Sequence, residues 1–307
     1  MNIRAQGDGA RAVVIYHNKC PDGFAAAFAA WLRLGEQAQY LAYDYGMEPP
    51  PVAGKDVYIV DFSFDAEVMQ QLEQAARTVV LLDHHETAVL ALRNYGCQCQ
   101  EPGRTFSVNG MRCKPGNLFH LDMNKSGARL AWEYFHGESE VPELVRYVED
   151  RDLWRWQYGD AARHYLAKLD SLPRDFALWR AVLEQSPEQR AEFVKAGEAM
   201  CERFNALVAS IAREARPLRL FGHKGLMVNT TREFASEVCE LLVKETGTFA
   251  AAWHHDAGGL LKVSLRGAPG FEVRSLAERL GGGGHPFAAA ARLPASRIGE
   301  LLTGSLG

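Results

Sequence analysis

Three short apolar runs, each ending in a residue that can bind a metal ion, most constrain how this chain can fold. Residues 12–17 read AVVIYH, residues 56–61 read DVYIVD, and residues 78–83 read TVVLLD. Segments with helical spacing, at 24–34 and 64–76, separate these runs. The alternation predicts βαβ units, and therefore an α/β fold with a mainly parallel sheet flanked by helices. Because the crossovers are right-handed, the ends of the three strands should share one edge of the sheet.

Potential metal ligands gather at that edge. His17 and Asp61 close the first two runs, and the triplet Asp83-His84-His85 closes the third. Open α/β sheets bind ligands outside the carboxyl ends of their strands. A site with paired metal ions needs carboxylates, one of them bridging, together with imidazoles. Further carboxylates that fit this set are Asp22 and, later in the chain, Asp150 or Asp152.

The composition favours a globular protein of two domains and argues against a membrane protein. The chain has 307 residues, of which 47% are hydrophobic, so it can bury a core in each of two domains. A formal net charge of -4 argues against a large surface for long nucleic acids. No run approaches the ~18 apolar residues of a membrane span, and the first residues do not resemble a signal peptide. We therefore expect a cytoplasmic protein without a membrane partner.

The six cysteines are too sparse for a disulfide scaffold in a chain of this length. A zinc site is one interpretation of four residues, Cys97, Cys99, Cys113 and His120. Their C-x-C spacing differs from the usual zinc knuckle. Reduced thiols are the expected state.

The composition and the spacing of apolar residues divide the chain into three regions. Residues 1–155 carry the strand-and-helix alternation, and residues 156–215 are charged and apolar at helical spacing, as in a helical connector. The sequence pattern predicts a smaller α/β domain over residues 216–307. We expect it to contain a hairpin, a helix near 234–245, and strands near 248–254 and 260–266. The connector offers a surface on which a homodimer could form.

A glycine run interrupts this last region, where residues 281–289 read GGGGHPFAA. Consecutive glycines let backbone N–H groups approach a phosphate without a Cβ in the way. His285 would add a side-chain donor to the same anion. We expect the run to lead into an alanine-rich helix.

The four N-terminal motifs, in their order and strand-end positions, resemble those of the DHH phosphoesterase superfamily. The glycine run with His285 and the alanines after Phe287 is similar to the GGGHxxAA signature of the DHHA1 domain. The resemblance spans residues from about 12 to 292. It implies an N-terminal DHH catalytic domain, a helical connector and a C-terminal DHHA1 domain that binds substrate.

The resemblance also implies roles for individual residues, with two divalent metal ions as cofactors and Mn²⁺ as the expected species. One ion would be held by His17, Asp22 and Asp61. The other would be held by Asp61, His84 and Asp150, with Asp152 as the alternative to Asp150. His85 would face the substrate phosphate and Asp83 would orient a neighbouring ligand. The substrate-binding residues implied in the C-terminal domain are Arg266, Gly282, Gly283, Gly284 and His285.

The implied activity is hydrolysis of linear dinucleotides such as pGpG or pApA, or of very short oligoribonucleotides, by a water that two metal ions activate. A pAp phosphatase or an exopolyphosphatase would use the same ligands and stays open. A nucleotide sensor without catalysis is a further alternative, because Asp22-Gly23-Phe24 carries one aspartate where many relatives carry two. Long nucleic acid is not an expected partner, since no extended basic groove is apparent.

Overall fold

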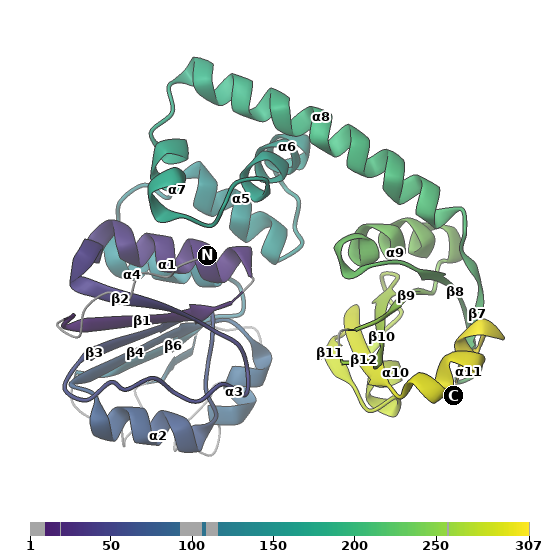
Figure 1. The fold of residues 1–307 in the computed structure, drawn as a ribbon, viewed down its shortest axis with the longest axis horizontal. Helices are drawn as coiled ribbons and strands as arrows, with labels where there is room; N and C mark the ends of the chain where they lie inside the picture. The colour runs from purple at the N-terminus through teal and green to yellow at the C-terminus, as the bar shows by residue number, and fades with distance from the viewer. Residues whose placement is uncertain (1–9, 19, 93–105, 109–115, 257, 307) are drawn as a thin grey trace. The chain divides into compact units, whose positions relative to one another are not determined.

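The computed structural model describes residues 10–18, 20–92, 106–108, 116–256 and 258–306, and it divides the chain into two compact units. Unit 1 comprises Met1–Met200 and unit 2 comprises Cys201–Gly307. Each unit has its own sheet and its own hydrophobic core (Figure 1). The long helix α8 (Pro187–Ala212) continues across the division, so the expected connector contributes to both units. Cys97, Cys99 and Cys113 lie outside the described residues.

Unit 1 is built on a six-stranded sheet in which five strands are parallel and the edge strand β5 is antiparallel to β6. The three apolar runs form the adjacent strands β1, β3 and β4, which confirms the predicted α/β fold. The sequence analysis missed β2, whose residues are mostly half-buried and lack a continuous apolar run. The strands, in spatial order, are β2 (Ala38–Tyr43), β1 (Ala12–His17), β3 (Asp56–Val60), β4 (Thr78–Asp83), β6 (Leu118–Leu121) and β5 (Phe106–Val108).

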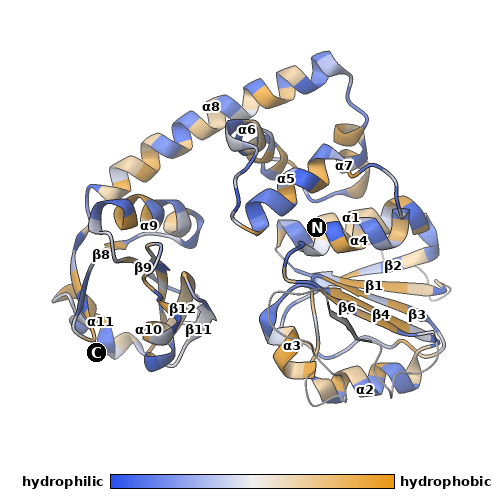
Figure 2. Ribbon diagram, turned by 180° about the vertical axis from the view of Figure 1, so that it is seen from behind, coloured by the Kyte–Doolittle hydropathy of each residue, from blue (hydrophilic) through white to orange (hydrophobic). Residues whose placement is uncertain are grey.

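Helices cover both faces of this sheet (Figure 1). Along β1, Val14 faces one core, whereas Val13 and Ile15 face the other. Burial on both faces explains why β1, β3 and β4 read as continuous apolar runs, which appear as orange strands in Figure 2. On one face lie α1 (Pro21–Leu34) and α4 (Gly127–His136), and on the other lie α2 (Ala66–Ala75) and α3 (Glu86–Leu92).

The rest of unit 1 is helical and packs against α1. The ring of Phe24 stacks on Phe176 at a centroid distance of 4.8 Å and meets the edge of Trp179 at the same distance. Phe24 is only 3% exposed, so its side chain belongs to the hydrophobic core. Trp179 and Phe193 are buried. The helices of this part are α5 (Glu143–Asp152), α6 (Gly159–Asp170), α7 (Phe176–Leu183) and most of α8.

Unit 2 contains a seven-stranded sheet with a helix, α9 (Arg232–Thr246), on one face. The short helices α10 (Arg274–Arg279) and α11 (Ile298–Leu302) pack on the other face. No helix within the described ranges is long and apolar enough to cross a membrane. The strands, in spatial order, are β11 (Gly283–His285), β12 (Ala288–Leu293), β10 (Leu261–Gly267), β9 (Phe249–His255), β8 (His223–Asn229), β7 (Arg216–Leu220) and β13 (Ser305–Leu306).

The alanine-rich segment after the glycine run is a strand, so the expected helix there is wrong. Residues 288–293 form β12, which lies between β10 and β11 and pairs with both in antiparallel register. Ala289, Ala291 and Leu293 are buried, which is the alternation of a strand. Alanine favours a helix in isolation. Pairing on both sides overrides that preference here.

The position of Phe24 leads to a stability prediction. Phe24→Asp should lower the free energy of unfolding by at least about 3 kcal/mol, because it removes a packed ring and buries a carboxylate. Phe24→Leu, which keeps an apolar side chain, should lose distinctly less. Guanidinium denaturation followed by tryptophan fluorescence measures both variants. A Phe24→Asp protein that keeps wild-type stability and binds an additional Mn²⁺ would show that this side chain belongs to a metal site.

Candidate metal centre

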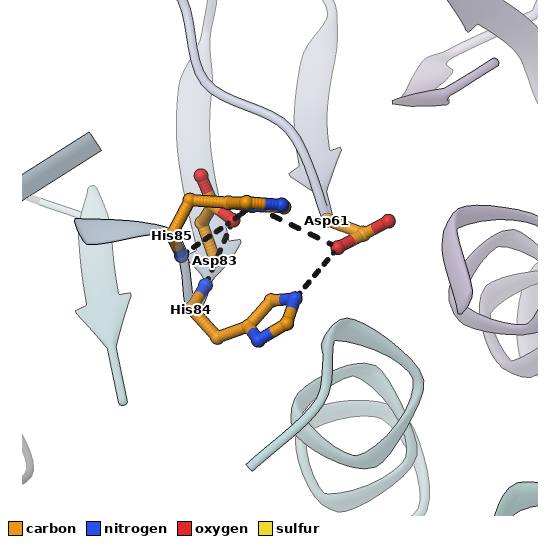
Figure 3. Close-up of side chains that lie close together, drawn as sticks. All are labelled: Asp61, Asp83, His84 and His85. Carbon is orange, nitrogen blue, oxygen red and sulfur yellow. Dashed lines mark hydrogen bonds and ion pairs between the residues drawn. The ribbon is translucent and has the colours of Figure 1, made fainter. Parts of the chain in front are cut away.

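The carboxyl ends of three neighbouring strands bring the predicted ligands together in unit 1. His17 is the last residue of β1, Asp61 follows β3, and Asp83 ends β4. Parallel register aligns these ends, since Tyr16 lies opposite Val60 and Val60 lies opposite Leu82. Figure 3 shows Asp61 facing the two histidines that follow Asp83.

Asp61 is the centre of this arrangement. One of its oxygens, Oδ1, lies 3.0 Å from Nε2 of His84 and 3.9 Å from Nδ1 of His85. The other oxygen, Oδ2, lies 3.7 Å from Nδ1 of His17. Burial alone raises the pKa of Asp61, but the neighbouring imidazoles of His17 and His84 and the charge of His85 outweigh it and bring the pKa below its usual range. Asp61 is therefore an ionised carboxylate whose two oxygens face different imidazoles.

Asp83 holds the two histidines rather than facing outward. It is fully buried, and its Oδ1 accepts hydrogen bonds from the backbone N–H groups of His84 (2.7 Å) and His85 (3.3 Å). The same oxygen lies 2.7 Å from Nδ1 of His85. Burial lowers the pKa of His85, yet the hydrogen bond and charge of Asp83 raise it above its usual value. With Nδ1 engaged, Nε2 is the nitrogen of His85 that can meet a ligand.

Asp22 reaches the centre from the first turn of α1. Its Oδ2 accepts from the backbone N–H of Gly127 at 2.6 Å, its Oδ1 accepts from that of Ala128 at 3.1 Å, and Oδ2 lies 3.7 Å from Nε2 of His84. The start of α4 thus faces this carboxylate, while Ser126 caps the same helix through a hydrogen bond from Arg129 N–H. Burial and the charges of Asp152 and Asp61 raise the pKa of Asp22.

Two glycines make this close approach possible. A Cβ on Gly127 would lie 2.4 Å from Cβ of Asp61. A Cβ on Gly23 would lie 2.5 Å from the carbonyl oxygen of His17. Any larger residue would push α4 or α1 away from the strand ends. The sequence shows these glycines beside Asp22 and Ser126, but only the packing reveals why they are needed.

The structure separates the two aspartates at the end of α5. Asp150 is fully buried and accepts hydrogen bonds from the backbone N–H groups of Gln157 (2.9 Å) and Tyr158 (3.3 Å). Asp152 lies at the rim of the centre, with Oδ2 3.5 Å from Nε2 of His84. The geometry therefore favours Asp152, the alternative named in the sequence analysis, over Asp150 as a ligand. Neighbouring aspartates on a helix point in different directions, which a sequence alone does not resolve.

The residues of this centre fit divalent metal ions. Three groups each place one ligand atom per residue within 4.8 Å of one another. Nδ1 of His17 and Oδ2 of Asp61 are buried and have no hydrogen-bond partner, although buried polar atoms are normally satisfied. A cation would satisfy these atoms and relieve the repulsion between the converging carboxylates. The groups are Asp61, Asp83, His84 and His85; His17, Cys20 and Asp61; and Asp22, His84 and Asp152.

Unit 2 carries a separate basic face beside α9. In the antiparallel register, Arg266 and His285 lie on either side of Ala288, so both side chains project from one face roughly 10 Å apart. Lys262 lies on that face, with His254 opposite it on β9 and Arg292 on β12. Burial and then the charges of Arg232 and Arg292 lower the pKa of Lys262. Converging positive charges of this kind suit an anion.

The predicted substrate residues are only partly available on this face. Arg266 donates to Oγ of Ser236 at 2.7 Å and to the Leu265 carbonyl at 2.9 Å, so α9 holds its guanidinium in place. A Cβ on Gly282 would lie 2.1 Å from the carbonyl oxygen of Ala290. A Cβ on Gly284 would lie 2.6 Å from Cα of Ala289, and its φ is 142°. Packing against β12 therefore requires these two glycines, whereas a Cβ on Gly283 would meet open space.

Lys262 and Arg292 were missed in the sequence analysis. Lys262 lies four residues before Arg266 on the same strand, and this spacing already places both on one face. Arg292 offered no comparable signal, because a helix was expected there. Trp253 packs against the core on the opposite face.

The two aspartates of α5 give a direct test of the centre. Asp152→Asn should weaken Mn²⁺ binding at least about tenfold, the lower end of the effect of altered groups around metal sites. Asp150→Asn should leave Mn²⁺ affinity near wild type but lower stability by about 1–3 kcal/mol, because one buried acceptor is lost. Isothermal titration calorimetry and thermal unfolding measure the two effects. The reverse pattern would restore Asp150 as the ligand.

A family model and a curated relative match this chain. Residues 207–303 match the DHHA1 domain family. A curated relative, an uncharacterised protein of Acanthamoeba polyphaga mimivirus, is 24% identical over 299 residues. That alignment covers 89% of this chain, and the chain spans 65% of the length of the relative.

Two solved structures share the fold at low sequence identity. The pGpG-specific phosphodiesterase PggH from Vibrio cholerae superposes with a TM-score of 0.50 at 13% identity, covering 95% of this chain and 96% of that one. The exonuclease RecJ bound to manganese has a TM-score of 0.50 at 12% identity, covering 96% and 89% of the two chains. The chain thus contains a segment that matches the DHHA1 domain family, and its fold is shared by these two proteins.

Proposed function

We propose that this chain is a metal-dependent phosphodiesterase that hydrolyses linear dinucleotides or very short oligoribonucleotides to mononucleotides. The observation that carries the proposal is the position of His84, whose Nε2 lies within 3.7 Å of carboxylate oxygens of Asp61, Asp22 and Asp152. Carboxylates and an imidazole at the carboxyl edge of a parallel sheet are the ligand types that paired metal ions use in phosphate chemistry. PggH and RecJ, which have this fold, are described as phosphodiesterase and exonuclease.

In the proposed centre, His84, Asp22 and Asp152 hold one cation, and His17 and Asp61 contribute to the other. When bound, two divalent cations lower the pKa of a water and neutralise charge that develops on the phosphate. Manganese is the ion we propose. Asp61 offers its two oxygens to different histidines, so it is the residue best placed to serve both positions.

His85 is proposed to contact the scissile phosphate. Asp83 fixes the orientation of its ring through Nδ1, which leaves Nε2 toward the substrate. The raised pKa of His85 favours a protonated ring, which can donate a hydrogen bond to a phosphate oxygen. Asp83 therefore acts through His85 and is a positioning residue.

Two hollows beside the centre suit a substrate with a nucleoside on each side of the phosphate. A cavity of 410 Å³ is lined by Tyr45 and Phe62, and the Tyr45 ring lies 5.7 Å from that of His17. A second cavity, of 230 Å³, is lined by Asp22, Asp152 and Trp154, a residue that is 44% exposed. Exposed aromatic rings next to a phosphate site favour stacking with nucleobases. This arrangement supports a dinucleotide over an inorganic phosphate chain.

The basic face of unit 2 is proposed to bind phosphate groups. Arg266 and His285 supply donors, and Lys262 adds positive charge. The same charges favour a second candidate function. A phosphate-rich substrate such as pAp or polyphosphate would also be attracted by Lys262 and Arg292.

Removing the central imidazole tests the proposed activity. His84→Ala should reduce Mn²⁺-dependent hydrolysis of pGpG by at least about 10²-fold, because it removes a residue shared by the carboxylates of the centre. Hydrolysis of pGpG, pApA, pAp and polyphosphate should be compared by chromatography for wild type and variant. His136→Ala is a matched control, because His136 contacts the Ala29 carbonyl away from the centre. Preferred hydrolysis of pAp or polyphosphate by the wild type would favour the second candidate, and absence of turnover would favour a sensor.

The cavity beside His17 gives a second test. Tyr45→Ala should raise KM for pGpG by roughly tenfold, as expected for loss of one stacking contact worth about 1–3 kcal/mol. Turnover of bis(p-nitrophenyl) phosphate, which has no nucleobase, should change much less. Tyr134→Ala serves as the control, because Tyr134 is also exposed but contacts Tyr58 and Phe135 instead. Equal losses on both substrates would argue that Tyr45 supports the centre itself.

A further inference from the structure

His17 and Asp61 do not share a further ligand with Asp22. Asp22 turns both oxygens to the backbone of α4, and it groups with His84 and Asp152. The side chain at position 24 is a phenylalanine in the aromatic core. His17 and Asp61 therefore need another donor if they are to hold an ion.

Cys20 lies where such a donor is needed. It directly precedes α1, which begins with Pro21, and its backbone is extended with φ -101° and ψ 128°. The tight contact of Gly23 with the His17 carbonyl anchors the start of α1 against the end of β1. As a result, His17, Cys20 and Asp61 each place one ligand atom within 4.8 Å of the others.

The other two atoms of this group lack partners. Nδ1 of His17 and Oδ2 of Asp61 are both buried, without a hydrogen bond, and lie 3.7 Å apart. This separation is too long for a hydrogen bond between them. The Asp61 side chain is only 1% exposed, so water does not compensate readily. A cation between the two atoms and the Cys20 sulfur would satisfy all three.

We propose that Sγ of Cys20 is a metal ligand, completing a nitrogen, oxygen and sulfur subsite with His17 and Asp61. The inference rests on the proposed metal centre and adds a residue to it. A thiolate favours softer ions, so this subsite should prefer Zn²⁺, Co²⁺ or Fe²⁺ over Mg²⁺. The subsite of His84, Asp22 and Asp152 has only nitrogen and oxygen donors. The two subsites therefore differ in metal preference, and binding at Cys20 releases the thiol proton to solvent.

Cobalt spectroscopy tests this ligand without relying on activity. Titration of the full-length protein with Co²⁺ should produce a near-ultraviolet sulfur-to-cobalt charge-transfer band. Cys20→Ser should abolish that band while the visible d–d absorption of Co²⁺ at the second subsite persists. Cys201→Ser, on α8, is the matched control and should keep the band. A Cys97→Ser, Cys99→Ser, Cys113→Ser triple variant should also keep it.

A second measurement uses the unaltered protein, in case Cys20→Ser folds poorly. Bound Zn²⁺ should slow alkylation of Cys20 by iodoacetamide at least tenfold, and EDTA should restore the rate, as followed by peptide mass spectrometry. Stoichiometric Co²⁺ binding without the band, or a band that survives Cys20→Ser, would overturn the assignment and leave the metal centre standing. If neither Co²⁺ nor Mn²⁺ binds, the metal centre and the proposed function both fail.

Discussion

The alignment of three parallel strand ends around Asp61 is the constraint on which the rest of the site depends. Asp61 has a φ of 53°, a left-handed conformation that costs a non-glycine residue on the order of 1–3 kcal/mol. Its backbone N–H donates to the Leu82 carbonyl, so the pairing of β3 with β4 holds this conformation in place. The carboxylate is then directed between His17 and His84. The strained conformation of Asp61 persists because β3 is paired with a strand on each side, β1 and β4.

Electrostatics in unit 1 follow from that geometry. Asp22 and Asp61 are almost fully buried, and burial together with mutual repulsion raises the pKa of Asp22. The first N–H groups of α4 stabilise the Asp22 carboxylate, and their approach depends on Gly127 having no Cβ. These hydrogen bonds compensate part of the negative charge of Asp22. The buried atoms without partners, Nδ1 of His17 and Oδ2 of Asp61, explain why the centre fits divalent cations.

Unit 2 uses glycine for a different physical reason from the one its sequence suggests. Gly282 and Gly284 lie against the backbone of β12, so their lack of a Cβ first serves packing of the sheet. The resulting register brings Arg266 and His285 to the same face. A basic face therefore follows from strand pairing, and the glycines contribute to it through that pairing.

The sequence by itself determined the parallel sheet, the edge at which ligands gather, and most residues of the centre, because apolar runs and strand ends are local features. It also determined that the motif Asp22-Gly23-Phe24 contains a single aspartate, because its third residue is a phenylalanine. Only the tertiary structure placed Asp152 rather than Asp150 beside His84, brought Cys20 to His17, and made residues 288–293 a strand. These outcomes depend on where a helix turns its side chains and on which strands flank a segment. Such contacts join residues distant in the chain, and local patterns do not encode them.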